Sequence, residues 1–252
     1  MKFHVLPVRT GAAAENMALD FLLLQRYPEA TVPRFRHYEW RKPAFTFGFS
    51  QKIEFVRANL PKDEVFDLCR RPTGGGIVDH RNDWTYTLVL PRGHALYDER
   101  AAQSYRVVHE CLAKALVDLG QPAVVKTECE VESCGSELAR DSGASRASSP
   151  PLPEPGVCFQ RAELYDVVNR TTGLKIAGAA QKRNKHGLLF QGSIDRSAVG
   201  ATDWEDFSAR FASALAQALR TDAQETPWPD LNEAEVEGLI EQYSAPEWVE
   251  YR

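Results

Sequence analysis

Three stretches of the chain carry apolar residues at the three- and four-residue spacing of a helix with one buried face. The first covers residues 16–27 and is stopped by the proline that follows it, and the second covers residues 99–119 and is closed by a glycine. The third opens at Thr202, because Thr202 and Glu205 have the spacing of a capping box. We therefore predict three amphipathic helices.

Between these helices the pattern is that of strands, which are short, rich in aromatic or β-branched residues and bounded by turn residues. Thr172-Gly173 and Lys185-His186-Gly187 have turn composition and connect the last three strands into an antiparallel meander. The sequence thus predicts an α+β fold, with a mixed or antiparallel sheet flanked by helices, rather than a regular βαβ alternation. The predicted strands are residues 34–40, 44–49, 85–90, 165–169, 174–182 and 188–194.

Two segments differ from the rest of this pattern. Residues 132–156 are rich in Ser, Gly and Pro and have almost no large apolar side chains, so they cannot offset the entropy of their own ordering. We interpret them as a flexible insertion, and their place just before Cys158 leaves a flap over a site as a second interpretation. Residues 221–252 could form a small acidic appendage. Otherwise we predict a single catalytic domain over residues 1–252.

Composition narrows the class of protein. An apolar share of 43% and a charged share of 26% are ordinary for a globular protein, and a net charge of −5 does not favour nucleic acid as a partner. No apolar run approaches the roughly 20 residues that span a bilayer, and the N-terminus has no signal-peptide pattern. The five cysteines form no CxxC pair, which indicates reduced thiols rather than disulfides or a metal site. We expect a cytoplasmic protein that does not bind a membrane.

A run of three glycines stands in residues 70–80, which read RRPTGGGIVDH. Consecutive glycines permit positive φ and let a ligand lie directly against backbone N–H groups. The run lacks the Gly-Lys-Ser/Thr ending of a nucleotide-binding P-loop. A tight turn would explain the glycines alone, and the flanking arginines and His80 favour a ligand only modestly.

Lys175 heads a second segment, residues 173–181, in which small residues follow it along a predicted strand. Small side chains leave room for a slender group such as an acyl chain to lie across the sheet. The lysine would supply a positive charge near a carbonyl group, although most lysines are solvated surface residues.

Cys158 lies between apolar neighbours, where a cysteine is more often an inert buried residue than a nucleophile. A nearby cation such as Lys175 would lower the pKa of its thiol and make it reactive. A pair of Cys158 with His80 or His186 is a further alternative that the spacing leaves open.

Taken together, four segments in this order resemble the biotin/lipoate ligase and octanoyltransferase superfamily, and the resemblance spans residues 16–194. They are similar to the first helix (residues 16–20), the W..P..S.G..Q strand (40–51), the RRxTGGGxVxH loop (70–80) and the K-[IV]-[AS]-G-[SA]-A-Q strand (175–181) of that superfamily. The resemblance implies a catalytic domain of the lipoate/biotin protein ligase type, which is class II synthetase-like.

Within the superfamily the chain looks most like the octanoyltransferases that use a cysteine. Cys158 stands where those enzymes carry their acylated cysteine, and residues 80–87 (HRNDWTYT) are similar to their H-D-x-E-L-T-Y-S rather than to the longer H-D-x-G-N-x-N-Y-S of lipoate ligases. The resemblance implies transfer of an octanoyl group from acyl carrier protein to Cys158, and then to a lysine of a lipoyl domain or a glycine-cleavage H-type protein. Lys175 would be the second catalytic residue, and no metal or cofactor is implied.

The resemblance also implies a set of substrate-binding residues, and one of them departs from the family pattern. The family usually has His-Gly-[ST] where this chain reads Gln191-Gly192-Ser193, and a glutamine can form hydrogen bonds but cannot take up a proton near neutral pH. The implied substrate-binding residues are Arg71, Thr73, Gly74, Gly75, Gly76, His80, Ala177, Gly178, Ala179, Gln191 and Gly192.

Two other functions share these motifs. An ATP-dependent lipoate-protein ligase would need ATP and Mg²⁺ and no cysteine. A non-catalytic relative would bind an acylated carrier or free lipoate without turnover, and Gln191 is its only support in the sequence. A biotin ligase fits least well, because the segment that begins at Lys175 matches the lipoate branch.

Overall fold

All of the predicted strands form, and further strands join them to build two sheets. The structure is a computed structural model that describes residues 1–128 and 162–251. In the larger sheet the strand order is β11-β1-β2-β6-β10-β9-β8-β7. Its strands are β1 (Lys2–Gly11), β2 (Arg34–Trp40), β6 (Asp83–Pro91), β7 (Ala123–Val125), β8 (Val167–Asn169), β9 (Lys175–Asn184), β10 (Gly187–Asp195) and β11 (Asp222–Glu225).

The larger sheet is mixed, as the α+β prediction allowed. Strand β1 runs parallel to both β2 and β11, whereas the pairs from β2 through β6, β10, β9 and β8 to β7 are antiparallel. Strand β1 escaped prediction because Pro7 lies within it and its register against β2 shifts between Leu6 and Arg9, so its side chains do not alternate cleanly.

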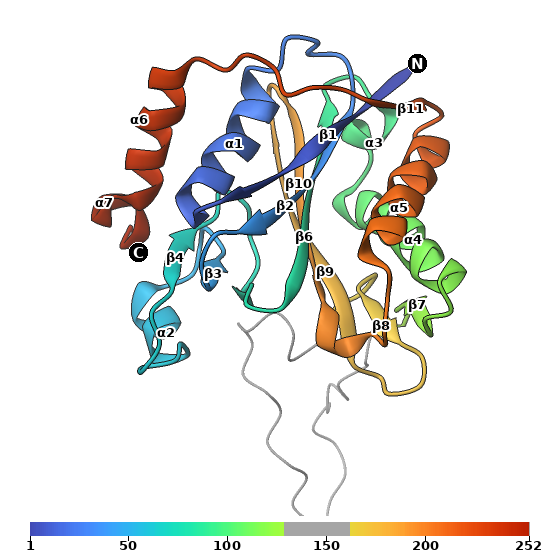
Figure 1. Ribbon diagram of the computed structural model, residues 1–252, viewed down its shortest axis with the longest axis horizontal. Helices are drawn as coiled ribbons and strands as arrows, with labels where there is room; N and C mark the ends of the chain where they lie inside the picture. The colour runs from blue at the N-terminus through green and yellow to red at the C-terminus, as the bar shows by residue number, and fades with distance from the viewer. Residues whose placement is uncertain (129–161, 252) are drawn as a thin grey trace, which may run out of the picture.

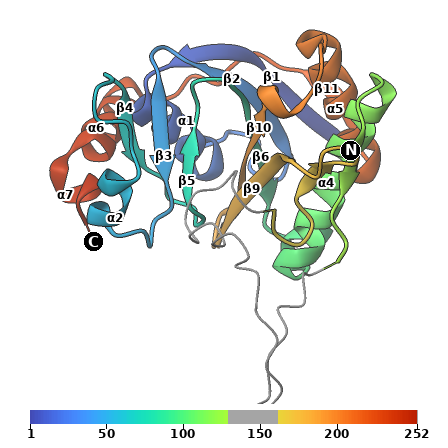
Figure 2. The ribbon, with the colours of Figure 1, turned by 90° about the horizontal axis from the view of Figure 1, so that it is seen from below.

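A smaller sheet of β3 (Ala44–Phe47), β4 (Asp67–Arg70) and β5 (Ile77–Asp79) lies beside the larger one. Seen from below, it stands next to α2 (Ile53–Ala58), at one side of the larger sheet (Figure 2). The predicted glycine segment forms the loop between β4 and β5. The smaller sheet therefore holds both ends of the loop.

Helices cover both faces of the larger sheet (Figure 1). On one face, α1 (Ala13–Gln25) packs Leu23 and Leu24 against Val89 and Leu189 of the sheet. On the other face, α4 (Ala101–Asp118) and α5 (Trp204–Ala218) pack against the sheet in the main core, where Phe211 contacts the ring of Tyr86. Because both faces are covered, β6 is buried almost throughout, at Thr85 and Thr87 as well as at its apolar residues.

The cap of α5 differs from the prediction. Asp203 is the N-cap residue, and its carboxylate accepts hydrogen bonds from the backbone N–H groups of Glu205 and Asp206. Thr202 instead donates its hydroxyl to the carbonyl of Gly200. A carboxylate one residue later satisfies the same free N–H groups and also suits the positive end of the helix dipole.

The residues after Thr221, marked in the sequence as a potential appendage, take part in the same fold. Strand β11 pairs with β1 at the sheet edge, and α6 (Glu233–Ser244) packs on α1 through Tyr243, which is 3% exposed. The short α7 (Pro246–Val249) follows it, and the remaining short helices are α3 (Ala95–Asp98) and a 3-10 turn at Arg196–Ala198.

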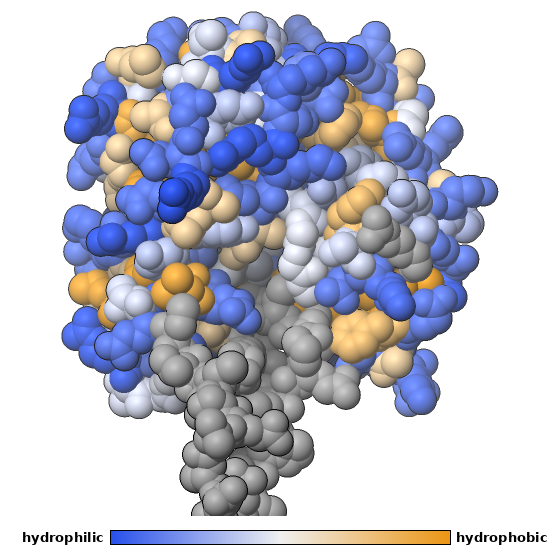
Figure 3. Space-filling view, turned by 180° about the vertical axis from the view of Figure 1, so that it is seen from behind, coloured by the Kyte–Doolittle hydropathy of each residue, from blue (hydrophilic) through white to orange (hydrophobic). Residues whose placement is uncertain are grey.

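The predicted insertion at residues 132–156 lies outside the described residues. Within the described part of the chain, no helix has both the length and the apolar character needed to cross a bilayer. The face turned away from the viewer in Figure 1 is largely hydrophilic, and its apolar residues gather in small separate patches (Figure 3).

Candidate functional site

A pocket with about 510 Å³ of space, part of it open to solvent, collects side chains from both sheets and from α1. Apolar wall residues include Met17, Tyr38, Trp40 and Val78. The predicted substrate or catalytic residues that line it are Arg71, Gly75, His80, Lys175, Gly178, Ala179, Gln191 and Gly192. The fold thus brings together segments that are about a hundred residues apart in the sequence.

The other predicted residues of the described chain stand outside the lining. Thr73, Gly74 and Gly76 lie in the loop between β4 and β5, residues 71–76, which we call the glycine loop. Each of them forms a hydrogen bond that is described below. Ala177, predicted to bind substrate, is fully buried in the main core beside Ile176, and its role stays a prediction. The register of β8 against β9 shifts at this point, so two consecutive residues of β9 are buried in the core instead of alternating.

The glycine loop lies directly on the strand-to-loop turn after β3. A Cβ atom on Gly48 would stand 2.0 Å from the carbonyl oxygen of Gly75, so only a glycine fits there. Gly75 itself has a φ of 90°, which favours glycine. Arg71 binds the loop from within, because its guanidinium donates to the carbonyl oxygens of Gly74 (2.9 Å) and Gly76 (3.0 Å). Arg71 therefore fixes the loop in place.

Lys175 is the first residue of β9, and its ammonium forms an ion pair with Asp166, with 2.7 Å between Nζ and Oδ2. Both side chains are buried, at 7% and 9% exposure. Gly178 makes this possible, since a Cβ atom there would lie 2.7 Å from Nζ of Lys175. Asp166 also accepts a hydrogen bond from the backbone N–H of Glu163 at 2.7 Å. The same carboxylate thus holds both the lysine and the chain just upstream of β8.

Gln191 occupies the centre of a buried polar chain. Its amide oxygen accepts from the hydroxyl of Thr73 at 2.7 Å, and its amide nitrogen donates to Asp20 at 2.6 Å. Asp20 is in turn paired with Arg36 at 2.7 Å, with both side chains fully buried. An amide accepts and donates at once whatever the pH, so Gln191 ties the glycine loop to α1 independently of protonation.

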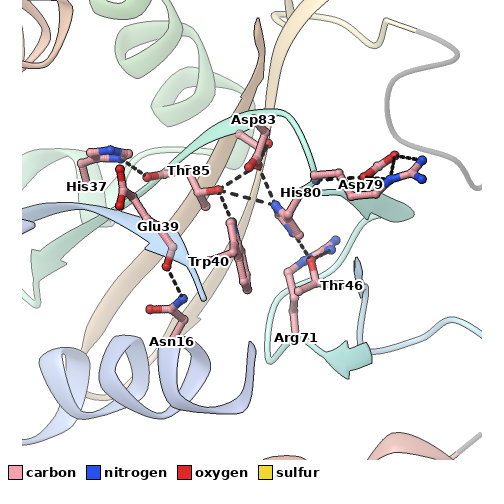
Figure 4. Close-up of polar contacts among 12 residues, drawn as sticks. Asn16, His37, Glu39, Trp40, Thr46, Arg71, Asp79, His80, Asp83 and Thr85 are labelled. Carbon is pink, nitrogen blue, oxygen red and sulfur yellow. Dashed lines mark hydrogen bonds and ion pairs between the residues drawn. The ribbon is translucent and has the colours of Figure 1, made fainter. Parts of the chain in front are cut away.

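His80 stands between a carboxylate and a hydroxyl (Figure 4). Its Nδ1 lies 2.6 Å from Oδ2 of Asp83, and its Nε2 lies 2.7 Å from Oγ1 of Thr46. The ring of Trp40 stacks on the imidazole, with the ring centroids 4.1 Å apart. The hydroxyl of Thr85 also donates to Oδ2 of Asp83, at 2.7 Å. The histidine is therefore fixed in one orientation at the pocket wall.

Cys158 and its neighbours lie outside the described residues, so its predicted pairing with Lys175 stays a prediction. The cysteines that the structure describes, Cys69 and Cys111, carry free buried thiols. Burial raises the pKa of the Cys69 thiol to about 12 and that of the Cys111 thiol to about 11, which keeps both protonated and inert at neutral pH.

Several residues of the site were missed from the sequence. Asp83 follows His80 by three residues, a spacing that could have suggested a pair. Asp166 gave no such signal, because it meets Lys175 only through the pairing of β8 with β9, in which Val168 lies opposite Lys175. Thr46 comes from the other sheet, and only the fold brings it to His80.

Comparison with known proteins identifies a family whose catalytic domain matches most of this chain. Residues 12–223 match the lipoyl protein ligase A/B catalytic domain family. An octanoyltransferase LipM of Bacillus cereus is 33% identical over 186 residues, which are 72% of this chain and 60% of that protein, so this chain spans less than two thirds of its length. An octanoyltransferase LipM of Exiguobacterium is 28% identical over 284 residues, covering 98% of this chain and 97% of that protein.

Solved structures agree on the fold. A chain from the structure of the bi-partite lipoate protein ligase and its lipoyl domain from Thermoplasma acidophilum matches with a TM-score of 0.71. The match has 18% identity and covers 100% of this chain and 98% of that one. At this identity the likeness concerns the fold alone. With most of its length matching the family, the chain belongs to the lipoyl protein ligase A/B catalytic domain family.

Proposed function

We propose that this chain is an octanoyltransferase. It takes an octanoyl group from the thioester of acyl carrier protein, holds it on Cys158, and passes it to a lysine of a lipoyl domain or a glycine-cleavage H-type protein. The relatives named octanoyltransferase LipM support this activity, as does the position of Cys158 just before the lysine strand.

The observation that carries the proposal is a single pocket in which a buried lysine meets the glycine loop beside an apolar wall. An acyl chain has one polar end and a slender apolar body. Met17, Tyr38 and Val78 offer apolar contact to the body, and the ammonium of Lys175 offers a positive charge to the carbonyl end. Pockets of this kind, apolar with a few placed polar groups, bind small apolar ligands.

Chain geometry is compatible with the role of Cys158. The backbone N–H of Glu163 is bound by the carboxylate of Asp166, which also binds Lys175. Cys158 precedes Glu163 by five residues, and five residues of extended chain span at most about 18 Å. A chain of this length is long enough for the thiol to meet Lys175, as the proposal requires.

The chemistry proceeds in two balanced steps. The thiolate of Cys158 attacks the carbonyl carbon of the donor thioester, a new C–S bond forms, and the carrier leaves as a thiol after taking up a proton. The neutral amine of the acceptor lysine then attacks the enzyme thioester, a C–N bond forms, the C–S bond to Cys158 breaks, and a proton passes from the nitrogen to the leaving sulfur. Because a thioester is already activated, the reaction as proposed consumes no ATP and needs no metal or cofactor.

The test is a transfer assay with octanoyl-acyl carrier protein as donor and an unmodified lipoyl domain as acceptor. Cys158→Ala should abolish transfer, whereas Cys134→Ala, a control cysteine in the same chain, should retain it. The proposal fails if Cys158→Ala keeps full activity. Activity of that variant with ATP, Mg²⁺ and free octanoate would instead identify a ligase.

A further inference from the structure

His80 has the surroundings of a proton acceptor, a role that its position in the substrate-binding motif does not require. The carboxylate of Asp83 only accepts hydrogen bonds, so its 2.6 Å contact means that Nδ1 of His80 carries the hydrogen. In the neutral ring Nε2 then has a free lone pair, and it accepts from the hydroxyl of Thr46 at 2.7 Å. The imidazole is thus held in the form that can take a proton at Nε2.

The hydroxyl of Thr46 links Nε2 of His80 to the pocket. Thr46 and His80 both line the pocket, and Oγ1 of Thr46 already accepts a hydrogen bond from Arg71 at 2.8 Å. A hydroxyl donates once and accepts twice, so among the side chains that the structure describes one acceptor position of Thr46 remains for a donor in the pocket. A proton given to Thr46 can pass on to Nε2 of His80 as the hydroxyl hydrogen shifts.

Asp83 is placed to stabilise the imidazolium that results. Its side chain is 1% exposed, and its Oδ1 is buried without a hydrogen-bond partner among the residues that the structure describes. The negative charge of this carboxylate would lie in contact with the ring while the ring carries the transferred proton. Two further charged groups act on a positive charge at His80. The guanidinium of Arg71, which donates to Thr46, repels it, and the carboxylate of Asp79, which is paired with Arg81, attracts it.

We propose that His80, held by Asp83 and reached through the hydroxyl of Thr46, accepts the proton that the acceptor lysine must lose before it attacks the acyl group. This inference rests on the proposed transferase. The ammonium gives one proton to His80, its nitrogen bonds to the acyl carbon, and the C–S bond to Cys158 breaks. A second proton goes from nitrogen to the leaving sulfur, and the amide keeps the third. His80 then releases its proton to solvent.

The proposal separates the two half-reactions, because forming the acyl-enzyme involves no amine. In His80→Gln, intact mass should show the octanoyl group loaded as in the wild type. Its transfer to a lipoyl domain, started after removal of the donor, should be slower by about 100-fold or more, as for the loss of a general base. The pH dependence of wild-type transfer should include a protonation step that the variant lacks. His94→Asn, at the cap of α3, is the matched control and should behave as the wild type.

Hydroxylamine provides a readout that a merely structural role would not produce. It is largely uncharged at neutral pH and needs no base, so it should clear the acyl group from His80→Gln as fast as from the wild type. Thr46→Val should slow lysine transfer and Thr46→Ser should restore it, which keeps the test open if His80→Gln fails to fold.

Three results would overturn the proposal. If His80→Gln or Thr46→Val transferred the octanoyl group to the acceptor lysine at the wild-type rate, the proton would not pass through Thr46 to His80. If His80→Gln lost both formation of the acyl-enzyme and transfer to the lipoyl domain, His80 would serve to shape the pocket and not to accept the proton. Absence of any acyl-enzyme in the wild type would remove the proposed transferase, and the inference with it.

Discussion

Gly48→Ala probes the contact on which the glycine loop depends. The added Cβ atom would stand 2.0 Å from the carbonyl oxygen of Gly75 and 2.7 Å from the carbonyl carbon of Gly74. Ordinary contacts of a Cβ atom begin near 3.4 Å, so the backbone of the loop must move by more than an ångström. No flexible side chain can absorb that shift, because both contacts are with main-chain atoms.

The expected result is a modest loss of stability with a large loss of activity. Overpacking of this kind costs about 1–3 kcal/mol, measured as the free energy of unfolding in urea. A displacement of about 1 Å near reacting groups lowers the rate by about 100-fold, measured as acyl transfer to a lipoyl domain. Gly238→Ala, where the added atom meets nothing within 4 Å, serves as control and should keep full activity. Wild-type activity and stability in Gly48→Ala would refute the role assigned to this contact.

Further predictions concern buried charge and buried amides. Asp166→Ala should lower the free energy of unfolding by about 3–5 kcal/mol, because it removes the carboxylate from a buried ion pair with Lys175; an unchanged urea midpoint would contradict this. Gln191→Leu should lower it by about 1–3 kcal/mol, since Asp20 and the loop hydroxyl each lose a partner, as thermal unfolding can check. Burial lowers the pKa of His109 below its ordinary 6.5, so the unfolded chain binds more protons in acid. Stability should therefore fall between about pH 7 and about pH 5, and His109→Gln should reduce that fall in urea titrations at the two pH values.

Much of the site could be predicted because its motifs are local. The glycine run and the strand that begins at Lys175 are each continuous in sequence, and the structure brings both to one pocket. The helices and antiparallel strands followed from periodicity, since each buries one face or both in a hydrophobic cluster on one side of the larger sheet or the other.

The rest depended on pairings that a single sequence does not show. Asp166, Asp83 and Asp20 look like ordinary acidic residues until strand register and helix packing bring them to Lys175, His80 and Gln191. The burial of Ala177 in the core has the same origin, because it comes with a local shift in the register of β8 against β9.

The most direct measurement of acyl transfer through Cys158 is intact mass after mixing the protein with octanoyl-acyl carrier protein, followed by peptide mapping. We predict one added octanoyl group, mapped to Cys158 and released by hydroxylamine, and no addition in Cys158→Ala. An unmodified wild-type protein that nevertheless transfers octanoate, or an octanoyl group mapped to another residue, would contradict it.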